Sequence, residues 1–138
     1  MKKLWKAAVL LYIGGMIYVL VELLWRGRSH PSMFLAGGLC FVLIGGINGG
    51  AGRSLPIFVQ ALLGAGIVTA VELAAGLILN VGLGLRVWDY SSLPLNFMGQ
   101  ICFYFYLLWI PLAGLAVVAD DWLRHVLFGE KMPAYRWF

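Results

Sequence analysis

The chain has 138 residues, of which 62% are hydrophobic and 12% charged, and it carries a formal net charge of +4. Soluble domains average roughly 45–50% apolar and about 25% charged residues, so this composition excludes an ordinary soluble domain. The ten lysines and arginines lie in short clusters between apolar runs, which indicates membrane-flanking charge and argues against a nucleic-acid partner.

Four apolar runs predict an all-α fold, a four-span transmembrane helical bundle that forms one domain over residues 1–138. The predicted spans cover residues 7–25, 32–51, 56–79 and 97–118. Their lengths approach the roughly 20 residues that cross a ~30 Å hydrocarbon core. The second and third runs are rich in glycine, which favours close packing of one helix against another.

Residues 119–138 are predicted to form an interfacial tail after the fourth span, with an amphipathic helix that Gly129 ends. Ala119, Trp122 and Val126 fall on one stripe, while Asp120 and Asp121 fall on the opposite face. Such a pattern is typical of a helix that lies along the membrane surface.

The distribution of basic residues predicts the orientation. With four spans, both termini and the loop after residue 48 share one side, which holds seven lysines and arginines against three on the other. The positive-inside rule then places both termini in the cytoplasm. We therefore expect a multi-pass protein of the cell inner (plasma) membrane.

The polar stretch from Leu83 to Gln100 and two intramembrane acids hold the candidate site. Glu22 and Glu72 lie within the first and third spans, toward the side that holds the polar stretch. Acids inside spans are costly, at about 2.5–3.5 kcal/mol for an unpaired charge, and are functional by default. The polar or substrate site candidates are Glu22, Arg26, His30, Glu72, Arg86, Asp89, Tyr90, Asn96 and Gln100.

Each of these residues also has a structural interpretation. The two glutamates can anchor hydrogen bonds that hold the helices together, and Asp89 can cap a helix-entry turn. Asn96 and Gln100 suit interhelical hydrogen bonds on the first turns of the fourth span. The cysteines and histidines lack metal-ligand spacing, so we expect no metal and no cofactor.

Several blocks of the sequence resemble a bacterial integral membrane family labelled "putative ABC-transporter type IV", also called an ABC transporter permease family. The resemblance rests on Val71–Leu73, Leu83–Ser91 with its Trp-Asp-Tyr-Ser motif, Pro94–Asn96, Gly99–Cys102 and the segment Arg26–Met33. It implies a transport role without naming a substrate or catalytic residues. Because the chain has no nucleotide-binding motif, an ABC role would require a separate ATPase subunit and self-association into a homo-oligomer.

Three functions therefore stay open. The leading one is a transport or permease-type component with an outward-facing polar site. The second is a non-transporting structural or regulatory subunit of the membrane. The third is an intramembrane enzyme acting on lipid, with Glu72 or Asp89 as general acid or base. A cavity that reaches the bilayer midplane and is lined by Glu72 would favour transport over a purely structural role.

Overall fold

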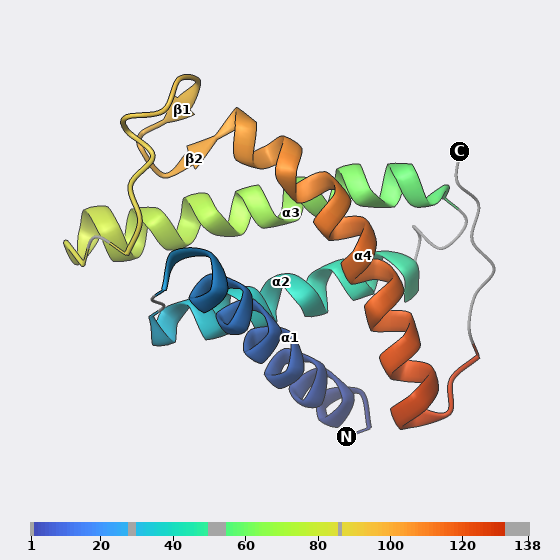
Figure 1. Ribbon diagram of the computed structural model, residues 1–138. Coiled ribbons are helices and arrows are strands. Elements are labelled where there is room, and N and C mark those ends of the chain that lie inside the picture. Colours follow the sequence, from blue (N-terminus) through green and yellow to red (C-terminus); the bar gives the residue numbers. More distant parts are fainter. Residues whose placement is uncertain (1, 28–29, 50–54, 86, 132–138) are drawn as a thin grey trace.

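The computed structural model describes residues 2–27, 30–49, 55–85 and 87–131 of the chain. Its elements are, in order, α1 (Lys2–Arg26), α2 (Pro31–Gly49), α3 (Ile57–Gly76), the π-helical segment η2 (Leu77–Gly82), β1 (Asn96–Phe97), β2 (Ile101–Cys102) and α4 (Phe103–Phe128). Figure 1 shows that α2 and α3 run roughly across the view between two ends of the bundle, while α1 and α4 cross it obliquely. The loop end carries residues 83–102, and at the terminal end the start of α1 meets the end of α4.

Among the described residues, three helical stretches are long and apolar enough to cross a membrane: 3–24, 57–82 and 103–128. The apolar part of α2, Pro31–Ile47, is shorter. An α-helix rises 1.5 Å per residue, so that part covers about 26 Å of a ~30 Å core. The chain is thus an all-helical membrane protein with three candidate spans and one shorter apolar helix.

Glycines set the close approach of α1 and α2. A Cβ at Gly14 would lie 2.5 Å from the Cβ of Phe41, and one at Gly37 would lie 2.5 Å from the Cβ of Tyr18. Side chains at these positions would therefore push the two helices apart. The most extensive helix contacts are those of α1 with α2 and of α3 with α4, so the bundle consists of two packed pairs.

The expected helical start of the fourth span is wrong over residues 97–102. Asn96–Phe97 and Ile101–Cys102 pair as short antiparallel strands, and α4 begins only at Phe103. The turn between the strands holds Met98 at φ 56° and Gly99 at φ 72°. These left-handed conformations are incompatible with a helix. Asn96 therefore does not line a face of the fourth span.

The expected surface-lying tail helix is not confirmed. Helix α4 runs without interruption from Phe103 to Phe128 and contains Pro111. Asp120 and Asp121 are buried, whereas Trp122 and Val126 are each 55% exposed. The acids face the interior because Asp120 pairs with Arg124 one turn later and packs against Gly45 of α2. The exposed side of this helix end carries Trp122, Val126 and Leu127 together with His125.

Candidate functional site

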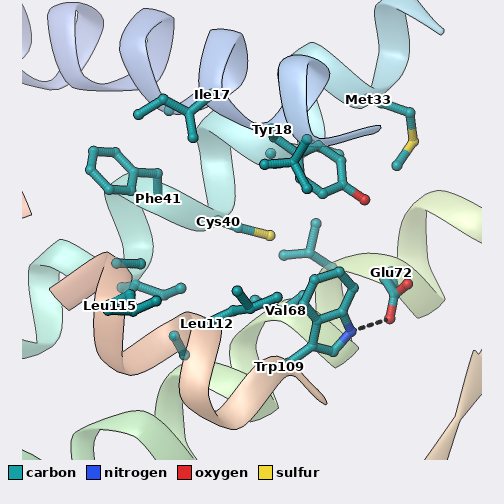
Figure 2. Close-up of a pocket in the computed structure, with 18 of the residues that line it drawn as sticks. Ile17, Tyr18, Met33, Cys40, Phe41, Val68, Glu72, Trp109, Leu112 and Leu115 are labelled. Atoms are coloured by element: carbon teal, nitrogen blue, oxygen red, sulfur yellow. Dashed lines mark hydrogen bonds between the residues drawn. The ribbon is translucent and has the colours of Figure 1, made fainter. Parts of the chain in front are cut away.

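A cavity of about 310 Å³ lies in the middle of the bundle, with walls from all four long helices. Most of its lining is aliphatic or aromatic. Three of the lining residues carry a hydroxyl, a thiol or a carboxylate: Tyr18, Cys40 and Glu72. Figure 2 shows the Tyr18 hydroxyl and the Glu72 carboxylate on one side of this space, with the Trp109 ring beside them. The volume falls at the small end of the range for ligand sites in proteins.

Glu72 is the buried acid of this cavity, and only 8% of its surface is exposed. It lies ten residues before Gly82 and fifteen after Ile57 in the continuous helical stretch α3–η2. At 1.5 Å per residue the α-helical stretch from Ile57 to Glu72 is about 22 Å long. Because η2 prolongs the helix beyond the predicted span, Glu72 lies in the middle region of the candidate span 57–82.

Two side chains donate hydrogen bonds to the Glu72 carboxylate. Trp109 Nε1 of α4 donates to Oε1 at 3.0 Å, and the Tyr90 hydroxyl of the loop donates to Oε2 at 2.9 Å. The ring of Tyr90 stacks on that of Phe105, with centroids 4.7 Å apart. Each carboxylate oxygen has two lone pairs, so both oxygens can accept one further hydrogen bond.

Glu22 lies near this carboxylate on the neighbouring helix α1. The Tyr18 hydroxyl hydrogen-bonds to Glu22, and Tyr18 also interacts electrostatically with Glu72. The two glutamates interact with each other as well. Acids from α1 and α3 therefore share a common neighbour within the bundle, and Glu22 is as buried as Glu72, at 9% exposed.

A second hydrogen-bond network closes the loop end of the cavity. Asn80 Nδ2 donates to Gln100 Oε1 at 2.8 Å, and Asn80 Oδ1 accepts from the Val87 amide at 2.6 Å. Trp88, which lines the cavity, donates from Nε1 to the Gln100 carbonyl at 2.9 Å. Gln100 packs on Gly76, where a Cβ would lie 2.5 Å from its Oε1. This network fastens the loop to the end of α3.

Two further candidates, Asp89 and Asn96, are not among the residues that line the cavity. Asp89 is exposed and accepts a hydrogen bond from the Ser91 amide at 2.9 Å, as in a turn cap. Asn96 stabilises the turn between the strands with two hydrogen bonds. Its Nδ2 donates to the Leu93 carbonyl at 2.7 Å, and its Oδ1 accepts from the Gly99 amide at 3.0 Å.

His30 precedes α2, and its Nδ1 accepts from the Ser32 amide at 3.1 Å. Arg86 lies outside the described residues, as does the side chain of Arg26. Among the described residues no group of three His, Cys, Asp or Glu side chains could hold a metal ion.

Sequence reasoning missed three residues of this site as candidates: Tyr18, Trp88 and Trp109. The i, i+4 spacing of Tyr18 and Glu22 places them on one helical face and could have identified Tyr18. A tryptophan in the middle of a span, away from the interface where tryptophans concentrate, needs a buried acceptor for its indole N–H. That requirement could have identified Trp109 as a partner of an intramembrane carboxylate.

Comparison with known proteins gives a family and no closer relative. No curated protein and no solved structure matches the chain. A family model matches residues 9–129, which include the whole of α2, α3 and α4 and all of α1 except its first seven residues. The chain therefore belongs to the family described as putative ABC-transporter type IV.

Proposed function

We propose that this protein is the membrane-embedded component of a transport system, and that its cavity binds an organic monocation with an apolar body. The observation that carries the proposal is the buried carboxylate of Glu72 in a cavity whose other walls are almost entirely apolar. The family description and the apolar helices support a transport role.

The charge of the site favours a cationic ligand. Among the described residues no lysine or arginine forms a salt bridge with Glu72. Its two hydrogen-bond donors, Tyr90 and Trp109, are neutral groups, so no described cation compensates the charge of this carboxylate. A charge within the hydrocarbon region is stabilised by a partner of opposite sign, which a cationic ligand would supply.

The aromatic walls favour an organic cation over a hydrated inorganic ion. The rings of Tyr18 and Trp109 lie with centroids 6.5 Å apart, and Trp88 lines the same cavity. Aromatic faces attract quaternary ammonium groups through cation–π interactions, worth about 2 kcal/mol when desolvated. A hydrated metal ion would lose its water in this cavity and find few oxygen ligands.

The position of the site fits passage across a membrane. Substrate sites of transporters lie near the bilayer midplane, at contacts between helices, and Glu72 lies in the middle region of its span. In this proposal α2 is the fourth span, the termini are cytoplasmic in the inner membrane, and the polar loop faces outward. A separate ATPase and a second copy of the chain complete the transporter.

Equilibrium binding to purified protein in lipid nanodiscs tests the proposal. Benzyltrimethylammonium is the cationic probe, and neopentylbenzene, in which carbon replaces the nitrogen, is its neutral isostere. We expect the cation to bind wild type and to lose about tenfold or more of its affinity in Glu72→Gln, a loss of at least about 1.4 kcal/mol. Asp89→Asn, which changes an exposed acid outside the cavity, should bind normally. Equal binding of cation and isostere to wild type would refute the proposal.

A second function has its own support. The hydrogen bonds that converge on Glu72 and Gln100 join three elements and would suit a structural or regulatory subunit without transport. In that case neither probe would bind wild type, and the only effect of Glu72→Gln would be a lower stability of the fold.

A further inference from the structure

A second buried acid, Asp120, lies on α4 near the terminal end of the bundle and far along the chain from Glu72. It is 0% exposed. Its carboxylate packs against the backbone of α2 at Gly45, where a Cβ would overlap the carboxylate. Ile44 and Ala119, the neighbours of these two residues, line the cavity. Asp120 therefore borders the end of the cavity opposite the loop.

The two oxygens of this carboxylate have unequal environments. Oδ2 accepts a hydrogen bond from Arg124 Nε at 3.0 Å, whereas Oδ1 is buried and has no hydrogen-bond partner among the described residues. A buried acceptor left without a partner costs about 1–3 kcal/mol, and more when it is charged. Native structures contain few such groups, and each requires an explanation.

The surroundings of Oδ1 restrict what can bind there. The carboxylate fills the space above Gly45, so little room remains for a hydrated cation. No group of three metal-ligating side chains exists among the described residues. A proton meets both restrictions because it needs no additional volume.

The end of α2 also favours a protonated Asp120. Helix α2 ends at Gly49, one turn after Gly45. The last four carbonyls of a helix lack intrahelical donors, and the negative end of the helix dipole disfavours a nearby carboxylate. A neutral acid would remove the second negative charge and provide an O–H donor to this carbonyl-rich end.

A chain of charges connects Asp120 to the surface. Arg124 Nη1 lies 3.7 Å from Glu130 Oε2, and that oxygen lies 2.8 Å from Lys6 Nζ of α1. The side chains of Arg124, Glu130 and Lys6 are 27%, 38% and 31% exposed. The other described charged or titratable groups here are Asp121, which is buried, and His125, whose Nδ1 contacts the Glu130 carbonyl. On α2, the residue that meets the Asp120 carboxylate is Gly45, which has no titratable side chain.

We propose that Asp120 is a proton-binding site, distinct from the ligand site at Glu72, that exchanges protons with the terminal side of the membrane. On binding, an O–H bond forms at Oδ1 as an O–H bond of hydronium breaks, and water leaves. Neutral Asp120 no longer compensates the charge of Arg124, which keeps its ion pair with Glu130. Release reverses both steps. This proposal does not depend on which ligand the cavity binds.

Infrared difference spectroscopy of the protein in nanodiscs, taken across a pH step, tests this site. Protonation gives a C=O stretching band of a buried carboxylic acid. We expect Asp120→Asn to lose this band, or the part of it that Asp120 contributes, and Asp89→Asn to retain it. An unchanged spectrum of a folded Asp120→Asn protein would overturn the proposal.

A second variant keeps the test decisive if Asp120→Asn does not fold. Arg124→Gln preserves the acid and removes the cation that stabilises its charged form. The band should then persist to higher pH than in wild type. A titration identical to that of wild type would overturn the proposal. The binding of benzyltrimethylammonium, measured separately, reports on the Glu72 site and distinguishes failure of one proposal from failure of the other.

Discussion

Replacing Trp109 by phenylalanine should show how strongly the buried carboxylate is held by its neighbours. The substitution removes the indole N–H that donates to Glu72 Oε1 at 3.0 Å and keeps an aromatic ring in the cavity wall. A hydrogen bond to a charged group contributes about 1.5–3 kcal/mol to stability. We therefore expect Trp109→Phe to lower the free energy of unfolding by about 2 kcal/mol, with a small further loss from the smaller ring.

A double-mutant cycle separates the hydrogen bond from packing. In Glu72→Leu the acceptor is absent, so Trp109→Phe should cost only its packing contribution. The difference between the two backgrounds should be about 1.5 kcal/mol or more. The unfolding free energies come from denaturant titration in detergent micelles, followed by circular dichroism.

Trp122 provides the matched control on the same helix, because it is 55% exposed. Trp122→Phe should change the unfolding free energy by less than about 0.5 kcal/mol, as is usual for surface positions. A coupling energy between Trp109 and Glu72 below about 0.5 kcal/mol, the limit of ordinary additivity, would refute the assigned hydrogen bond.

Three other predictions concern helix packing, access to the cavity and the loop. Gly37→Ala should lower the unfolding free energy by about 1–3 kcal/mol, because the new Cβ would overlap a side chain of α1. As its control, Gly66→Ala places the new Cβ in open space and should be neutral or stabilise the fold by up to about 1 kcal/mol. Cys40 lines the cavity, and a thiol among apolar side chains reacts slowly because the thiolate is the nucleophile. In a Cys102→Ser background a small apolar maleimide should therefore label Cys40 slowly and faster at alkaline pH, and bound benzyltrimethylammonium should slow the labelling further; equal rates with and without ligand would contradict the site. Gln100→Leu removes the hydrogen bond from Asn80 of η2 at 2.8 Å and should loosen the loop. Limited proteolysis would detect this as faster cleavage between residues 83 and 102, and an unchanged cleavage rate would count against this role.

Hydrophobic run length predicted the helices well, because a span needs about 20 apolar residues regardless of its neighbours. The run from Phe97 to Val118 misled at both ends, since α4 begins only at Phe103 and continues to Phe128. Apolar character alone does not report backbone conformation, and the left-handed residues Leu95, Met98 and Gly99 interrupt the helix that the run indicated. Asn96 beside these residues was the available sign of a turn, since asparagine favours such conformations.

The meeting of Glu22 with Glu72 was predictable, but their partners were not. Two acids in separate spans at similar depth tend to face the interior, because lipid cannot solvate them. Which aromatic residue donates to which acid depends on how helices pair and rotate, and a single sequence does not specify this. The burial of Asp120 was missed for the same reason, since it depends on the absence of a side chain at Gly45 of a different helix.

The position of a bound cation shows directly whether the cavity is the cation site. A structure of the protein with para-bromobenzyltrimethylammonium would locate the bromine by its anomalous scattering. We expect one bromine peak inside the cavity, with the ammonium group in contact with Glu72 and the ring of Trp109. A peak on the lipid-facing surface, or an empty cavity at a saturating concentration of the probe, would contradict it.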